Sequence, residues 1–214
     1  MNKLRARLAL TDSRGMTLVE VVVAISIMGI VATAAVAFII SSIVSSATHQ
    51  RGQIAITIAN QAMESASAQS SATNPLTGVS YLYQGRYKPS VLNVWTANAE
   101  VSGDATTYPG WDPTATAASV PSLPLETVYT RSGTDYKATT LIGNCYQAMS
   151  GGDCTVITGF DPAVQPVPAG MTQLIRVIVV VSWTAGKQCE VDGCSYQTTS
   201  LIDPHGDLQW NVHD

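Results

Sequence analysis

Residues 14–40 read RGMTLVEVVVAISIMGIVATAAVAFII, and this stretch decides how the chain is organised. From Val21 to Ile40 it holds twenty consecutive residues without a charged side chain. A helix rises about 1.5 Å per residue, so twenty residues span about 30 Å, the thickness of the hydrocarbon core of a bilayer. The sequence therefore predicts one membrane-spanning helix close to the N-terminus.

Basic residues are distributed unevenly around this apolar run. The fifteen residues before Met16 contain four basic side chains and one acidic side chain, whereas Arg51 is the only basic residue among the dozen that follow Ile40. Because basic flanks of membrane helices stay on the cytoplasmic side, the N-terminus is expected in the cytoplasm. The rest of the chain is then expected outside the membrane.

Two common kinds of N-terminal segment fit less well. A secretory signal peptide has an apolar region of about 7–15 residues and a small-residue cleavage site, but this run is longer and no polar region follows it before the chain resumes a helical pattern. A plain membrane anchor leaves Glu20 unexplained. An acidic side chain at the centre of a membrane helix costs about 2.5–3.5 kcal/mol, and less near its edge, so Glu20 is expected to have a function.

The segment from Arg14 to Glu20, followed by the apolar run, resembles the cleavage and methylation motif of type IV prepilins and pseudopilins. In that family a membrane peptidase cuts after the glycine that ends a basic leader, the new terminal residue is N-methylated, and a glutamate is fifth in the mature chain. The resemblance implies that Gly15 precedes the cut, Met16 becomes the methylated N-terminus and Glu20 is the assembly carboxylate. Many members have phenylalanine where this chain has Met16.

The resemblance also implies a function and partners. The chain would be a structural subunit of a type IV pilus-like filament, and a minor pilin or pseudopilin rather than a major pilin. Its partners would be the prepilin peptidase, other pilin subunits contacted through the N-terminal helix, the cytoplasmic membrane and the pilus assembly machinery. Glu20 of one subunit would pair with the Met16 amine of a neighbour, and breaking such a buried pair is strongly destabilising. The final location would be a cell-surface or periplasmic filament.

After Val44 the pattern stays helical but becomes amphipathic, so a helix of about 50–56 residues is expected. Its apolar stripe is predicted to pack on a sheet; the stripe contains Ile54, Ile58 and Ala62, with Ala55, Ala59 and Ala66 beside them. The expected fold class is α+β, a long helix packed on an antiparallel β-sheet head. The expected division is a leader at 1–15, a transmembrane helix at 16–44, its amphipathic continuation at 45–73 and an extracytoplasmic β-rich head at 74–214.

The head has β-rich segments separated by loops. The candidate strands are residues 79–87, 91–101, 127–131, 136–142, 174–184, 196–202 and 208–212. The segment LIRVIVVVSW within 174–184 has β-branched residues on both faces, which predicts a central strand. It should form a hairpin with 196–202. Residues 103–124, which include Tyr108 and Trp111, and residues 159–170 are proline-containing and are predicted to be surface loops.

The four cysteines form two close pairs in sequence. Loop-closure cost is lowest for near neighbours, which favours disulfides Cys145–Cys154 and Cys189–Cys194, although four cysteines allow three pairings. A zinc site with four thiolates is disfavoured, because neither pair has the usual C-x2-C spacing and an exported head favours oxidation.

No enzyme or cofactor is expected. The sequence has no phosphate-binding loop, HExxH or GxSxG motif. The turn around Asp203 and His205 and the acidic loops around Asp153 and Asp192 lack a defined set of metal ligands. Without the first fifteen residues the chain has 7 basic and 14 acidic side chains, which argues against nucleic-acid binding. The alternative function is a non-polymerising, single-pass, membrane-anchored binding or adhesion domain.

Overall fold

The computed structural model describes residues 16–69, 74–75, 79–99, 106–162, 164–185, 189 and 193–204. Helix α1 runs without interruption from Leu18 to Ala68, 51 residues, as the expected helix of about 50–56 residues requires. The chain forms two compact units, Met1–His49 and Gln50–Asp214. Helix α1 therefore contributes residues to both units.

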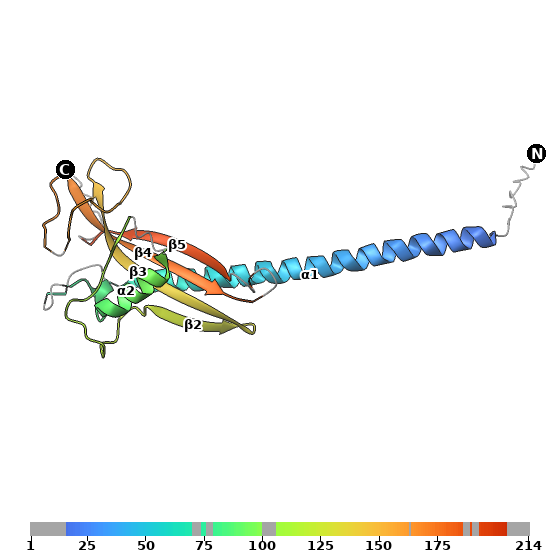
Figure 1. The fold of residues 1–214 in the computed structure, drawn as a ribbon, viewed down its shortest axis with the longest axis horizontal. Coiled ribbons are helices and arrows are strands. Elements are labelled where there is room, and N and C mark those ends of the chain that lie inside the picture. Colours follow the sequence, from blue (N-terminus) through green and yellow to red (C-terminus); the bar gives the residue numbers. More distant parts are fainter. Residues whose placement is uncertain are drawn as a thin grey trace, which may run out of the picture. The chain divides into compact units, whose positions relative to one another are not determined.

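The second unit contains an antiparallel sheet, shown in Figure 1. Among the described residues its strands are β1 (Tyr108–Pro109), β2 (Glu126–Arg131), β3 (Thr134–Ala148), β4 (Met171–Trp183) and β5 (Cys194–Ile202). β4 lies between β3 and β5, and the other edge of β3 is shared by β1 and β2. The α+β prediction is confirmed, and so is the hairpin, which β4 and β5 form.

Strand β4 is central and apolar on both faces. Val177, Val179 and Val181 join the core cluster that contains the buried residues of α1. Ile178 and Val180 face the other way and pack with Trp95. Because successive strand residues point to opposite faces, a run of valine and isoleucine suits a strand that is covered on both sides. The sequence prediction for this segment is confirmed.

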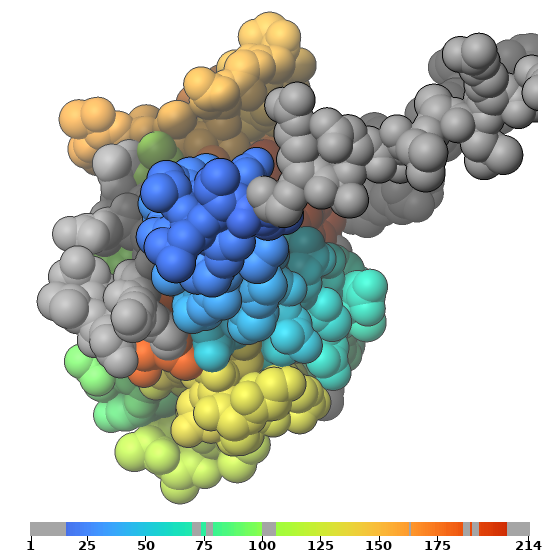
Figure 2. All heavy atoms as spheres, turned by 90° about the vertical axis from the view of Figure 1, so that its right-hand side faces the viewer, coloured from blue at the N-terminus to red at the C-terminus, as the bar shows by residue number. Residues whose placement is uncertain are grey.

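The C-terminal part of α1 packs on the sheet mainly through alanines. Ala55 and Ala59 have no exposed surface, and Ala66 is equally buried. Ile58 is buried beside them, whereas Ile54 is only half-buried. The stripe expected on the sheet therefore lies in the core, and its alanine side is the most deeply buried part. Figure 2 shows the β2–β3 hairpin, in yellow, beside this part of α1.

Two predicted strands are wrong. The segment 88–97 is helix α2 (Lys88–Ala97), and the segment 81–83 is a short 3₁₀ helix, η1 (Tyr81–Tyr83). Pro89 stands in the first turn of α2, where its missing N–H costs nothing. Val91 and Trp95 are one helical turn apart and both are buried, so this apolar pattern has the helical period rather than the strand period.

Other predicted boundaries shift or fall outside the described residues. The segment 127–131 is β2 and the segment 136–142 lies within β3, which continues to Ala148. The loop predicted at 103–124 contains the two-residue strand β1, paired to Asn144 and Gly143. The strand predicted at 208–212 lies outside the described residues.

Enlarging Ala59 is expected to destabilise the second unit. Ala59 is fully buried where α1 meets the sheet, so Ala59→Leu would force the helix away from the strands at a cost of about 1–3 kcal/mol. Chemical denaturation of the full chain in detergent would measure the loss. Thr57→Leu is the matched control, because Thr57 is exposed on the same helix. Equal stability of the two variants would contradict this packing.

Candidate functional site

The first turn of α1 is capped by the residues of the sequence motif. Thr17 immediately precedes the helix, and the backbone N–H of Glu20 donates to both its carbonyl oxygen, at 3.0 Å, and its Oγ1, at 3.3 Å. A threonine before the helix with a glutamate three residues later is the capping-box pattern. Glu20 also lies at the positive end of the helix dipole, which favours a carboxylate there. The Thr17 hydroxyl therefore caps the start of α1, and residue 20 stands where a carboxylate suits the helix.

The hydroxyl groups in the apolar part of α1 are satisfied within the helix. Ser26 donates to the carbonyl of Val22 at 2.8 Å, and Thr33 donates to the carbonyl of Ile30 at 2.8 Å. In lipid, polar groups need partners inside the protein. These two side chains are thus compatible with a membrane-spanning segment.

The apolar part of α1 is not covered by other described parts of the chain. Every residue from Met16 to Ser46 is exposed. Helix α1 is also long and apolar enough to cross a membrane. Met16 and Glu20 lie together at its start, while Gly15 lies outside the described residues. A contact between Glu20 and the amine of another subunit stays a prediction.

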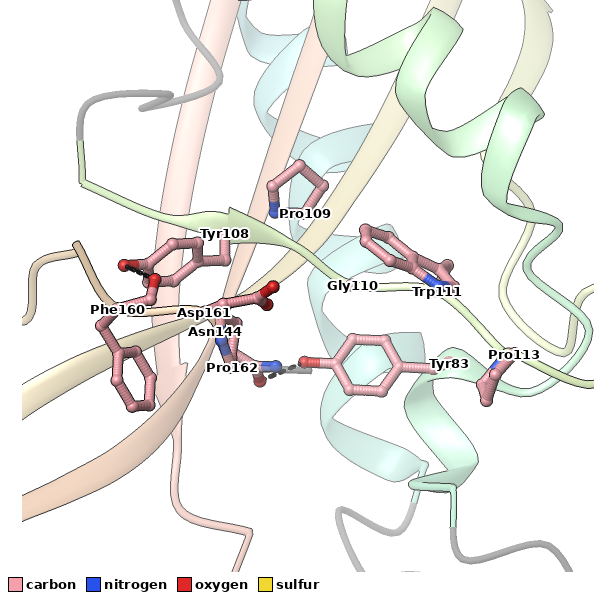
Figure 3. A pocket seen from close by; sticks show the side chains of 10 residues that line it. All are labelled: Tyr83, Tyr108, Pro109, Gly110, Trp111, Pro113, Asn144, Phe160, Asp161 and Pro162. Atoms are coloured by element: carbon pink, nitrogen blue, oxygen red, sulfur yellow. Dashed lines mark hydrogen bonds between the residues drawn. The ribbon is translucent and has the colours of Figure 1, made fainter. Parts of the chain in front are cut away.

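A second candidate site is a cleft of about 470 Å³ in the head, shown in Figure 3. Its lining combines aromatic and proline side chains with one amide and one carboxylate: Tyr83, Tyr108, Pro109, Gly110, Trp111, Pro113, Asn144, Phe160, Asp161 and Pro162. The two loops predicted from the sequence, 103–124 and 159–170, thus meet at one place. No local pattern in the sequence predicts this meeting, because the folded sheet brings the two loops together.

Hydrogen bonds fix the aromatic side chains of the cleft. The Tyr83 hydroxyl donates to Oδ1 of Asn144 at 2.6 Å. The Tyr108 hydroxyl donates to the carbonyls of Ile157, at 2.7 Å, and Phe160, at 3.0 Å. Gly110 is required beside Tyr83, because a Cβ there would lie 2.1 Å from the tyrosine ring. The cleft is therefore built largely in advance of any ligand.

Arg86 and Asp112 are two buried, hydrogen-bonded polar residues near this cleft. Arg86 has no exposed surface, and its guanidinium donates to the carbonyls of Leu123, at 3.1 Å, and Thr140, at 2.7 Å. Its burial lowers the pKa of the guanidinium to about 10, although the nearby Tyr83 acts in the opposite direction. The carbonyl of Arg86 accepts from the backbone N–H of Asp112 at 3.0 Å. These contacts join the segment after η1 to the loop before β2 and to strand β3.

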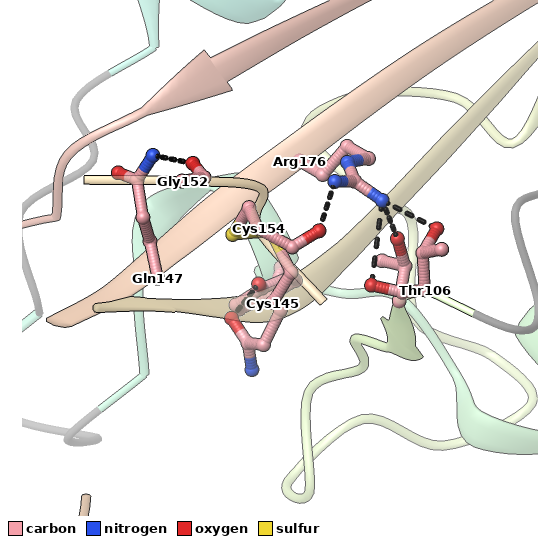
Figure 4. Close-up of a disulfide and its surroundings, with 9 residues drawn as sticks. Thr106, Cys145, Gln147, Gly152, Cys154 and Arg176 are labelled. Atoms are coloured by element: carbon pink, nitrogen blue, oxygen red, sulfur yellow. Dashed lines mark hydrogen bonds between the residues drawn. A yellow bond between two sulfur atoms is a disulfide. The ribbon is translucent and has the colours of Figure 1, made fainter. Parts of the chain in front are cut away.

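The disulfide Cys145–Cys154 ties the long β3–β4 connection back to β3, as Figure 4 shows. Arg176 on β4 donates to the carbonyl of Cys154 and to Oγ1 of Thr106, at 2.6 Å. The second disulfide joins Cys189 to Cys194. These are the pairings that loop closure favours.

Asp112 is expected to make the head sensitive to acid. Burial alone would raise the pKa of its carboxyl, but hydrogen bonds from Gly85 and Thr114 outweigh burial and lower it. Because the pKa is lower in the folded state, the stabilisation is present above about pH 4 and is lost as pH falls through the folded-state pKa. Asp112→Asn should cost about 1–2 kcal/mol at neutral pH, and less at pH about 3.

Urea denaturation of the full chain at several pH values measures this difference. Asp135→Asn is the control, because Asp135 is exposed near the start of β3. A stability gap between Asp112→Asn and the unsubstituted chain that stays constant with pH would contradict the stated role of the Asp112 carboxylate.

In the described part of the chain, no three His, Cys, Asp or Glu side chains are grouped so that they could hold a metal ion. His205 and Asp192, considered in the sequence analysis, lie outside the described residues. No sequence motif marks Tyr83, Asn144 or Phe160 as parts of a site. Each is ordinary in its local sequence, so only the fold reveals that they share a cleft.

Comparison with known proteins concerns the N-terminal region alone. Residues 10–36 match the family model described as the prokaryotic N-terminal methylation motif, which is typical of type IV pilins and pseudopilins. The match includes Gly15, Met16 and Glu20, and the resemblance noted in the sequence is confirmed at that level. No curated protein and no solved structure matches the chain.

Proposed function

We propose that this chain, a type IV pilin-like protein with an N-methylation motif and a long hydrophobic N-terminal helix, is a structural subunit of a membrane-rooted filament. It would serve as a minor pilin or pseudopilin. The prepilin peptidase would cut after Gly15, and Met16 would become the methylated N-terminus. The 16–44 segment would cross the membrane before assembly, and the head would lie outside.

The observation that carries this proposal is an apolar helix segment that the described part of the chain leaves exposed. Large side chains such as Val22, Ile30 and Phe38 are more than half exposed. At about 25 cal/mol per Å² of apolar surface, such a segment is costly in water, so it needs lipid or other subunits around it. A helix that first lies in the membrane and then packs against the helices of other subunits is surrounded by lipid before assembly and by protein after it.

Cleavage would prepare the helix to move from the membrane into the filament. It removes a leader with four basic side chains and one acidic side chain, and it creates an amine at Met16. In a filament core of low dielectric constant, this amine and the Glu20 carboxylate of a neighbour would neutralise each other. Such pairs add little net stability, but leaving one partner alone costs about 3–5 kcal/mol, so the pair would set the register between subunits.

The capping of α1 favours one alternative function. In a non-polymerising membrane-anchored adhesion domain, Glu20 would serve only to start the helix with Thr17. That domain would not need the cut after Gly15.

Shearing of filaments from cells separates the two functions. We expect the chain in the sheared filament fraction of host cells that contain the prepilin peptidase. It should stay in the membrane fraction of cells that lack the enzyme. Retention in the membrane of both cell types, with filaments present, would favour the anchored domain.

A further inference from the structure

We propose that the head of this chain binds the head of a second copy, with residues 164–168 of each copy entering the head cleft of the other. These residues read VQPVP and are named the proline loop. The contact lies outside the N-terminal helix, on which the proposed filament depends. Two copies anchored in one membrane can therefore form it without a filament.

The proline loop is an exposed apolar segment. Val164 is 76% exposed, Val167 is 40% exposed, and Pro166 is exposed between them. The one polar side chain, Gln165, turns back to its own chain, because its Oε1 accepts a hydrogen bond from the backbone N–H of Asp161 at 3.0 Å. Single exposed apolar residues are common, whereas grouped ones are typical of interaction surfaces.

The backbone of the proline loop is restricted before any contact forms. Pro166 and Pro168 have φ fixed at about −65°, and the residue before each proline favours an extended conformation. The backbone N–H of Gln165 donates to the carbonyl of Asp161 at 3.0 Å. At the other end, the backbone N–H of Met171 donates to the carbonyl of Pro168 at 3.1 Å. A preformed proline-containing segment loses little conformational entropy when it docks.

The head cleft has the kind of lining that such segments bind. Extended proline-rich segments dock in grooves of aromatic side chains, and Tyr83, Tyr108 and Phe160 line this cleft. In Figure 3, Tyr108 and Phe160 lie on one side and Tyr83 lies on the other. The Lys88 ammonium already lies 4.4 Å from the centroid of the Trp111 ring. The proposed contact therefore uses the other three rings.

Asn144 offers the polar contact that suits the backbone of the proline loop. Its Oδ1 accepts a hydrogen bond from the Tyr83 hydroxyl at 2.6 Å, so the amide presents Nδ2 to a ligand as a donor. A proline-containing segment has few N–H groups but keeps its carbonyl acceptors. The loop has no charged residue, and the cleft volume of about 470 Å³ is that of a small-ligand site, about 300–1,000 Å³. A short neutral segment rich in acceptors therefore suits this cleft.

The position of the proline loop favours a second copy of this chain as the partner. The loop closely follows Pro162, which lines the cleft, so loop and cleft are neighbours on one head. Because Val164 and Val167 are exposed, the loop does not fill its own cleft. In a twofold pair each loop meets the cleft of the other copy, and two contacts form at once. An unrelated proline-rich peptide makes only one.

Such a contact is small, and small interfaces are weak in free solution. Anchoring of both copies in one membrane raises their effective concentration, which favours a weak contact between them. The heads are therefore expected to pair when several copies share a membrane.

Site-specific photo-cross-linking of the full chain in proteoliposomes tests the contact. Benzoylphenylalanine, a photoreactive amino acid, replaces Val164 in unlabelled chains, which are mixed with an equal amount of isotope-labelled, unsubstituted chains. We expect cross-links from position 164 of an unlabelled chain to the segments that carry Tyr83 or Tyr108 in a labelled chain. Mass spectrometry distinguishes these from cross-links within one chain, because only contacts between copies join unlabelled to labelled peptides.

Benzoylphenylalanine at Val128 is the matched control for the photoreactive group. Val128 is 62% exposed on β2 and lies outside both the loop and the cleft, so this position should give no cross-link to the cleft. Val167→Asp, combined with benzoylphenylalanine at Val164, should lower the yield by about tenfold or more, because a carboxylate would lose its hydration among aromatic rings. Val128→Asp in the same background should leave the yield unchanged.

The proposal is overturned if no cross-link joins position 164 to the cleft of another copy. It is also overturned if position 128 gives these cross-links at the same yield, or if Val167→Asp has no effect. The proteoliposomes contain no prepilin peptidase, so the result does not depend on cleavage or on filament assembly. Failure of the proposed function would therefore not be mistaken for failure of head pairing.

Discussion

Glu20→Val is expected to leave cleavage after Gly15 intact and to abolish incorporation of the chain into filaments. The substitution removes the carboxylate that would neutralise the Met16 amine of a neighbouring subunit. An unpaired buried charge costs about 3–5 kcal/mol at each subunit contact, and the cost recurs along a filament. Immunoblots of sheared filament and membrane fractions would measure the shift of the chain from one to the other.

Three further variants separate assembly from helix capping. Glu20→Gln keeps a side chain that suits a capping box but removes the charge, so it should fail to assemble as Glu20→Val does. Thr17→Ala weakens the cap by about 1 kcal/mol and keeps the carboxylate, so it should assemble. Glu64→Val is the matched control, because Glu64 is exposed on the later part of α1. Normal filaments from Glu20→Gln would show that the charge has no role in assembly.

Removal of the disulfide Cys145–Cys154 is expected to lower the stability of the head by a large amount. The bond closes a loop with a sequence separation of 9, and the chain-entropy relation gives about 2–3 kcal/mol for a loop of this size. Both cysteines are buried. The double variant Cys145→Ala, Cys154→Ala should therefore lower the free energy of unfolding by that amount, measured by chemical denaturation.

The second disulfide provides a comparison within the same chain. Cys189–Cys194 has a sequence separation of only 5, so its removal should cost less, about 2 kcal/mol. The first disulfide also fixes the position of Cys154, whose backbone carbonyl accepts a hydrogen bond from the Arg176 guanidinium. Its loss should make the β3–β4 connection easier to cleave with a protease. Unchanged stability and protease resistance would contradict a structural role for Cys145–Cys154.

The sequence predicts the N-terminal module and the central strand because each depends on local composition. Twenty uncharged residues after Glu20 specify an apolar helix regardless of what packs on it. The run of β-branched residues around Val179 specifies a strand buried on both faces. The alanines of α1 were visible as part of its stripe, but their complete burial depends on the strand residues that share the core with them.

The failures also have physical reasons. Val91, Val94 and Trp95 have high β-propensity, yet their spacing places them on one face of a helix, and tertiary packing outweighs propensity. The burial of Arg86 has no local signal, since its hydrogen-bond partners Leu123 and Thr140 are distant in sequence. The cleft also could not be predicted. Each of its loops is recognisable from the local sequence, but the two loops come together only when the sheet folds.

Mass spectrometry of the protein extracted from membranes and filaments tests the proposed processing and assembly most directly. In cells that contain the prepilin peptidase, the mature chain should begin at Met16, carry one N-terminal methyl group and lack residues 1–15. The filament fraction should contain only this form. An intact chain that begins at Met1 in those cells, or a filament-bound chain cut elsewhere, would contradict the proposal.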